Sequence, residues 1–290
     1  MPRSTSRCAA TPLWVAAMLL CVLPTGGCGG ERSAGAARPL VLVSVAPQRS
    51  FVRRLAGDRV DVEVMVPPGA NPVLFEPTLG QLRALQEAAL YVKVGHPDFP
   101  FEQAHLAQLL DEHPELPVAD GAAGTALRAG DPHYWLAPGP ARAMARSIAR
   151  ALVERFPEHR DEFQANLAAL LADIDTLDRE LRRTLAGSRG ARFFVFHPGW
   201  GYFAEAYGLL QVAVEQDHKT PTAHRTAELA SAAREAGVRA IFVQPQFDPR
   251  AARLLAEEIG ARPIVLDPLA EDWFANMARA GRLLAEHSVP

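Results

Sequence analysis

Three side chains in this sequence combine metal-binding chemistry with a rigid setting. His133 follows Asp131-Pro132 in a short loop, while His197 and Asp267 each end a hydrophobic run and precede a proline. Proline fixes its own backbone angle and restricts the residue before it, so each of these places is conformationally limited. Two imidazoles and a carboxylate form a ligand set that suits zinc, and manganese less well. We therefore take these three residues as a candidate site for a divalent transition metal.

Each of the three also has a purely structural interpretation. His133 could be a surface histidine in a turn, His197 could cap its strand, and Asp267 could cap the helix that follows it. No two of them stand four residues apart, the spacing of a zinc-binding helix, so spacing alone does not define a site. The repeated context of strand end, ligand and proline is what favours metal binding.

The first 28 residues are predicted to be an export signal. Two arginines precede an apolar run from Leu13 to Leu23, which is shorter than the roughly 20 apolar residues of a membrane-spanning helix. The small residues before Cys28 resemble a bacterial lipoprotein cleavage site. We expect residues 29–38 to form a tether and Cys28 to carry a lipid anchor in a membrane. A freely secreted protein and an uncleaved anchor are the alternatives.

The composition limits the kinds of ligand and partner. The chain has 290 residues, of which 49% are hydrophobic and 22% are charged, and its formal net charge is -3. This is enough for one large domain or two lobes, and the weak negative charge argues against nucleic acid as a partner. All three cysteines lie within the first 28 residues, so a metal site elsewhere must use histidine and carboxylate ligands.

The rest of the chain alternates strand-like and helix-like patterns. Strands are predicted at Leu40–Ala46, Val60–Val66, Leu90–Val94, Arg192–His197, Gln211–Val214, Ala240–Val243 and Pro263–Asp267. Helices are predicted between them, including one from Pro77 to Ala88 whose residues Leu79, Leu82 and Leu85 face inward. Strands that alternate with helices form parallel βαβ units.

A long helical pattern separates the two halves. It runs from Ala141 to Leu185 and is broken once, at Pro157. Apolar residues recur at spacings of three and four from Phe163 to Leu181, which predicts one helix of about seven turns.

We therefore predict an α/β fold of two lobes with mainly parallel sheets. The lobes are residues 39–138 and 188–290, and a rigid helical segment, residues 139–187, joins them. Ligands of open α/β sheets bind beyond the carboxyl ends of the strands. The metal site is therefore expected in the cleft between the lobes.

Four motifs resemble those of the metal-binding solute-binding proteins of zinc and manganese ABC importers. They are Pro67–Pro77, Asp131–Leu136, Phe196–Phe203 and Leu266–Leu269, and they occur in the family's order. The resemblance implies two α/β lobes, a rigid linking helix and a buried ion between the lobes, which is delivered to a membrane permease. We expect the protein to be a monomer. His133, His197 and Asp267 fall on three of the family's four ligand positions. A histidine at position 197 favours zinc, because manganese members tend to carry glutamate there.

The fourth ligand position departs from the family pattern. The family has a histidine directly after an Asn-Pro or Asp-Pro pair, and this chain has Val73 there. We expect Val73 to be buried beside the ion, where it offers no lone pair. Water, His96 or Glu76, in that order, are the candidates to complete the coordination.

The sequence thus predicts an extracytoplasmic zinc carrier and not an enzyme. One alternative is a metal-binding scaffold that serves in adhesion or sensing, or that carries another ligand. A second alternative is a zinc hydrolase, because three protein ligands and an open position are also how catalytic zinc sites are built. Such an enzyme would need a general base, for which Glu76 or Glu215 is conceivable.

The lipid anchor leads to a direct test. Changing Cys28 to Ser should release the protein from the membrane fraction to the soluble fraction, because the apolar run is too short to anchor the chain by itself. Fractionation of cells that express each form measures this. Continued membrane attachment of Cys28→Ser would show that the uncleaved segment or a partner holds the protein.

Overall fold

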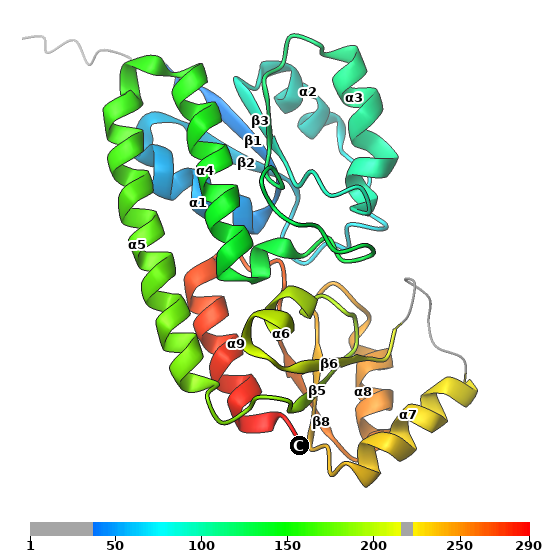
Figure 1. The fold of residues 1–290 in the computed structure, drawn as a ribbon. Coiled ribbons are helices and arrows are strands. Elements are labelled where there is room, and N and C mark those ends of the chain that lie inside the picture. Colours follow the sequence, from blue (N-terminus) through cyan, green and yellow to red (C-terminus); the bar gives the residue numbers. More distant parts are fainter. Residues whose placement is uncertain (1–36, 216–222) are drawn as a thin grey trace, which may run out of the picture. The chain divides into compact units, whose positions relative to one another are not determined.

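The computed structural model describes residues 37–215 and 223–290, and its compact unit is Arg38–Pro290. The predicted export signal, Cys28 and most of the predicted tether lie outside the described residues. Two four-stranded sheets form the framework, one in each half of the chain, and all of their strand pairs are parallel (Figure 1).

The first sheet has the strand order β2-β1-β3-β4. Its strands are β1 (Leu40–Val45), β2 (Asp61–Val66), β3 (Leu90–Lys93) and β4 (Val118–Asp120). Its connections carry α1 (Ala46–Ala56), α2 (Leu79–Glu87) and α3 (Ala107–Glu112). The central strand β1 is buried from Val41 onward, as expected for a run of β-branched and aliphatic residues covered on both faces.

The second sheet repeats this plan in the order β6-β5-β7-β8. Its strands are β5 (Arg192–Val195), β6 (Leu210–Ala213), β7 (Ala240–Val243) and β8 (Arg262–Val265). Helices α6 (Gly201–Tyr207), α7 (Ala223–Glu235) and α8 (Pro249–Ile259) belong to this half. The predicted α/β fold with two parallel-sheet lobes is confirmed.

The two halves share one system of helices. Helices α4 (Pro138–Arg155) and α5 (Arg160–Thr184) separate the sheets in the sequence, with Pro157 between them, and α9 (Trp273–His287) ends the chain. Figure 1 shows α5 running past α1 and α4 and then past α9, and α5 contacts all three. The predicted apolar stripe is buried along α5, at residues Phe163, Leu170, Ile174, Leu177 and Leu181.

The larger of two clusters of buried side chains joins the halves, and the smaller lies within the second half. The larger cluster contains residues of β1, the α5 stripe, and Trp273, Met277 and Leu284 of α9. The proposed boundaries of the lobes, residues 39–138 and 188–290, stay a prediction, because this cluster and the packing of α9 on α5 cross them.

One local expectation is wrong, and one strand was not predicted. Leu79 is 74% exposed, although it was expected to face inward. It is the first residue of α2, where Thr78 caps the helix and accepts from the Gln81 backbone N–H, and only Leu85 of this helix is buried. The three-residue strand β4 was not expected, because so short a segment carries too few residues to show an alternating pattern.

Two tryptophans tie the loop before α4 to the loop before α9. The indole N–H of Trp135 donates to the Pro268 carbonyl at 2.8 Å, and that of Trp273 donates to the Trp135 carbonyl at 2.7 Å. Both rings are fully buried, and Phe51 of α1 packs edge-on against Trp273 at 5.3 Å between ring centroids. We call these two bonds the indole clasp.

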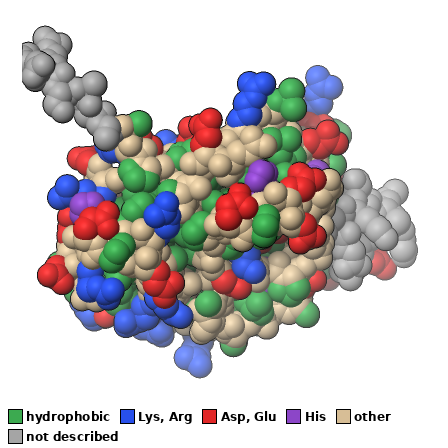
Figure 2. Space-filling model, turned by 90° about the horizontal axis from the view of Figure 1, so that it is seen from above, with side chains coloured by type: hydrophobic (Ala, Val, Ile, Leu, Met, Phe, Trp, Pro, Cys, Tyr) green, Lys and Arg blue, Asp and Glu red, His purple; other side chains and the backbone are tan. Residues whose placement is uncertain are grey.

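The surface carries charges of both signs. On the face shown in Figure 2, Lys and Arg side chains alternate with Asp and Glu side chains. Arg38–Asp61 and Arg59–Glu162 are examples of exposed ion pairs, and each contributes little to stability. None of the helices in the two described ranges is long and apolar enough to cross a membrane.

The indole clasp gives a stability prediction. Replacing Trp273 by Phe removes the N–H donor, leaves the buried Trp135 carbonyl without its partner and removes part of a packed ring. The metal-free protein should lose about 2–4 kcal/mol of unfolding free energy in urea. Leu254→Ala, at a position that is 67% exposed, is the control and should change stability by less than about 0.5 kcal/mol. Equal stability of Trp273→Phe and the parent would contradict a structural role for the clasp.

Candidate metal centre

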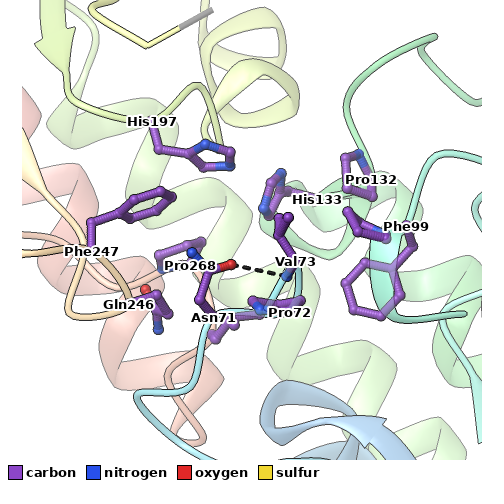
Figure 3. Close-up of a pocket in the computed structure, with 12 residues that line it drawn as sticks. Asn71, Pro72, Val73, Phe99, Pro132, His133, His197, Gln246, Phe247 and Pro268 are labelled. Carbon is purple, nitrogen blue, oxygen red and sulfur yellow. Dashed lines mark hydrogen bonds between the residues drawn. The ribbon is translucent and has the colours of Figure 1, made fainter. Parts of the chain in front are cut away.

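A small cavity lies where loops from both halves meet. Its volume is about 30 Å³, enough for an ion with one or two water-sized neighbours, since a water needs about 10–15 Å³ by this measure. Figure 3 shows the side chains around it. The first half contributes Asn71, Pro72, Val73, Phe99, Pro100, Pro132 and His133, and the second half contributes His197, Gln246, Phe247, Pro268 and Leu269.

His133 is oriented by the carboxylate of Asp131. One oxygen, Oδ1, accepts from both the His133 backbone N–H (3.1 Å) and the ring nitrogen Nδ1 (3.0 Å). A carboxylate only accepts, so Nδ1 carries the proton and Nε2 keeps the lone pair. Burial alone would raise the pKa of Asp131, but its hydrogen bonds with His133 and the electrostatic attraction of His133 and Arg128 together outweigh burial and lower that pKa. The carboxylate therefore stays ionised.

His197 is also oriented by a carboxylate, but its partner is farther away in the sequence. Its Nδ1 lies 2.7 Å from Oε2 of Glu215, which is also buried. The Gln244 side chain holds the backbone of His197 through both its N–H (3.2 Å) and its carbonyl (3.0 Å). Phe247 stacks on the ring at 5.0 Å. Burial, which has the largest effect, and the neighbouring His133 together lower the pKa of His197 more than Glu215 raises it, so this imidazole is neutral at pH 7.

The two imidazoles, one from each half of the chain, lie next to each other in an edge-to-face arrangement. Their ring centroids are 5.4 Å apart, with the planes at 74°. The loop after β5 approaches closely because it contains glycine at two points. A Cβ on Gly199 would lie 3.4 Å from Nε2 of His133, and one on Gly201 would lie 2.5 Å from Oδ2 of Asp131. A side chain at position 201 would displace the carboxylate that orients His133, whereas a Cβ at position 199 would make only an ordinary van der Waals contact with the histidine ring.

Asp267 does not line the cavity itself but contacts a residue that does. It is half-buried, and its Oδ1 accepts from Nε2 of Gln246 (2.8 Å) and from the Leu269 backbone N–H (2.9 Å). Gln246 lines the cavity, and Asp267 does not. Within residues 37–215 and 223–290, no group of three or more His, Cys, Asp and Glu side chains stands close enough to hold an ion. The structure thus brings His133 and His197 together at the cavity, and it places Asp267 outside the cavity lining, in contact with Gln246.

Val73 lines the cavity but is not buried. Its side chain is 43% exposed, so the expectation of a buried valine is wrong. The reason is local: Oδ1 of Asn71 accepts from the Val73 N–H at 2.9 Å, drawn as the dashed line in Figure 3. This Asx turn sets the direction of the chain at the mouth of the cavity.

Neither protein candidate for the fourth ligand reaches the cavity. His96 is buried, but its Nδ1 accepts from the Asp98 N–H (3.0 Å) and its Nε2 lies 3.0 Å from the Arg128 carbonyl. Both ring nitrogens are therefore engaged by backbone groups of the surrounding loops. Glu76 is exposed and does not line the cavity. Of the three candidates for the fourth ligand, only water is compatible with these positions of His96 and Glu76.

Sequence reasoning missed the residues that orient the ligands. Asp131 stands two places before His133, and this spacing alone could have suggested the pairing. Glu215 follows β6, and parallel pairing of β5 with β6 brings it beside His197. Gln246 follows β7 in the same way. A systematic search for polar residues just after each predicted strand would have found the last two.

Two parallel α/β lobes, a long shared helix and histidines from both lobes at one small cavity define the class of metal-binding, extracytoplasmic solute-binding proteins. A family model described as "Zinc-uptake complex component A periplasmic" matches residues 41–286. The chain belongs to this family, which consists of solute-binding proteins and not of enzymes. The predicted resemblance is confirmed.

Individual relatives agree with this assignment. The high-affinity zinc uptake system protein ZnuA of Bacillus subtilis (strain 168) is 26% identical over 273 residues, covering 86% of each chain. A putative metal-binding protein of Chlamydia trachomatis is 26% identical over 251 residues, covering 83% of this chain and 88% of the relative. A crystal structure of ZnuA is 36% identical, with a TM-score of 0.81, and covers 86% of this chain and 99% of the other.

The pairing of His197 with Glu215 gives a prediction for the metal-free protein. An NMR titration should show His197 gaining its proton below the ordinary pKa of about 6.5, because burial opposes the charge. Glu215→Gln should lower this pKa further, because it removes the group that raises it and leaves the burial. Glu205→Gln, at an exposed residue bound to Arg128, is the control and should leave the titration unchanged. A rise in the Glu215→Gln variant would contradict this pairing.

Proposed function

We propose that His133, His197 and Asp267 bind the zinc ion that this extracytoplasmic solute-binding protein delivers to the permease of an ABC importer. The observation that carries the proposal is the pair of imidazoles at one small cavity, each with a carboxylate on Nδ1. In metal sites such a carboxylate fixes the tautomer, orients the ring and raises the basicity of the ligating nitrogen.

The donor set favours zinc over manganese. Nitrogen ligands suit zinc, while manganese prefers an all-oxygen environment. Asp267 adds one carboxylate through Oδ2, to which no group in the described part of the chain donates. The charges of Asp131 and Glu215 lie behind the two imidazoles and further stabilise a divalent cation.

The geometry supports carriage and argues against hydrolysis. A cavity of about 30 Å³ has no room for an organic substrate beside the ion. Glu215, a conceivable general base, is bound to His197, and Glu76 lies outside the cavity. A small site that holds a single ion and can release it is what an importer requires.

We further propose that the protein works as a monomer tethered by a lipid on Cys28. The support comes from the sequence: small residues precede Cys28, and a small, polar segment follows it up to the start of the compact unit at Arg38. The tether would keep the protein near the membrane that holds the permease. Lipids of this kind add affinity for the bilayer in proportion to the buried chain length.

Ligand removal tests the site. His133→Ala and His197→Ala should each weaken zinc binding by at least about 100-fold, because each removes one of two imidazoles from a three-ligand site. Titration against a competing chelator measures the affinity, and circular dichroism checks the fold. His113→Ala, at a residue that pairs with Glu115 away from the cavity, is the matched control. Parent-like zinc affinity in both site variants would refute the proposed ligands.

A further inference from the structure

Gln246 carries a buried oxygen whose partner is missing among the described residues. The side chain is 9% exposed, and its Nε2 donates to Oδ1 of Asp267 at 2.8 Å. Its Oε1 is fully buried, and no described group donates to it. A buried amide oxygen without a donor is costly, so its presence at a binding site calls for a partner that arrives with the ligand.

The orientation of this amide follows from its neighbour. Oxygen and nitrogen of a glutamine are interchangeable by shape, and hydrogen bonding decides between them. Because the carboxylate of Asp267 only accepts, the N–H end of Gln246 must face it, and Oε1 must take the other end. Figure 3 shows Gln246 at the cavity, with its oxygen on the side of Phe247 and its nitrogen turned away.

The cavity has room for a donor as well as an ion. Its volume of about 30 Å³ exceeds the about 10–15 Å³ that a single water needs. Val73, which stands at the family's fourth ligand position, supplies neither a ligand nor a donor from its side chain. Asn71 also lines the cavity, but it does not donate a hydrogen bond to Oε1 of Gln246.

We propose that Oε1 of Gln246 accepts a hydrogen bond from a water molecule bound to the zinc ion at the coordination position that Val73 leaves without a protein ligand. This inference rests on the proposed function. A metal polarises its bound water and makes it a strong hydrogen-bond donor. Oε1 of Gln246 is a buried acceptor without a donor, so the two groups are complementary. Through its other end, the same amide holds Asp267, so one side chain positions both the water and the carboxylate ligand.

Gln246 acts as a positioning residue and not as a ligand of zinc. Zinc sites are built from thiolate, imidazole and carboxylate groups, whereas neutral amide oxygens are ligands of harder cations such as calcium. A residue of this kind acts on affinity through the groups it orients. Replacing partners of this type typically weakens metal binding about 10- to 100-fold.

The first test replaces the amide by an apolar side chain of similar length. Gln246→Met should weaken zinc binding about 10-fold or more. In the cobalt(II)-loaded protein, the same variant should bind azide more tightly than the parent does, because an anion in place of the water presents lone pairs, not protons, to Oε1. Visible absorption of cobalt follows azide binding. Gln48→Met, at a buried glutamine bound to the Lys93 carbonyl, is the matched control and should change neither affinity.

The second test removes the water. Val73→His places an imidazole at the open position and should tighten zinc binding about 10- to 100-fold, since each tenfold gain is about 1.4 kcal/mol. In this background Gln246→Met should cost less than it does in the parent, because the bond between water and amide no longer exists and only the hydrogen bond to Asp267 is lost. Such coupling appears as non-additivity. An equal cost in both backgrounds would overturn the proposal.

The outcomes separate this inference from the function on which it rests. If the parent fails to bind zinc, or if His133→Ala and His197→Ala bind it like the parent, the proposed function is wrong. If the parent binds zinc and both histidine variants lose it, while Gln246→Met changes neither zinc nor azide affinity, only the role of Gln246 is wrong. Weaker zinc binding together with tighter azide binding in Gln246→Met supports the bound water.

Discussion

The geometry of the site depends on the indole clasp. The Trp135 N–H reaches the Pro268 carbonyl, and the Trp273 N–H returns to the Trp135 carbonyl. Both bonds are buried, where water does not compete and a lost partner is not replaced. They fix the loop that carries His133 against the loop that carries Asp267. Since α9 packs on α5 within the shared core, this local connection is part of the main body of the protein.

Two carboxylates orient the imidazoles, one close to its histidine in the sequence and the other far from it. Asp131 acts within one tight turn, whereas Glu215 reaches His197 only because β6 pairs with β5. Gln246 and Gln244 follow β7 on the other side of β5. Carboxyl ends of neighbouring parallel strands thus gather polar side chains from segments that are distant in the sequence.

The sequence made the fold and two of the cavity residues predictable, because strand and helix periodicities depend on local patterns that this chain keeps. The burial stripe of α5 follows directly from its spacing of apolar residues. Leu79 shows the limit: the pattern placed it on an inner face, but it lies at the first residue of α2 and is exposed. The exposure of Val73 depends on a side-chain hydrogen bond from Asn71, and the link from Gln246 to Asp267 depends on tertiary contact. Neither leaves a periodic signal.

The partly exposed Val73 has a consequence for the kinetics of metal exchange. A cage closed by four protein ligands releases its ion only after one of them dissociates, which makes release slow. At the proposed site one side of the coordination sphere would adjoin a small aliphatic side chain that is 43% exposed to solvent. An incoming ligand would approach there and bind before any protein ligand leaves, which is an associative substitution. A carrier of this design would hold its ion for a shorter time and transfer it more readily, by ligand exchange with an acceptor group on the permease.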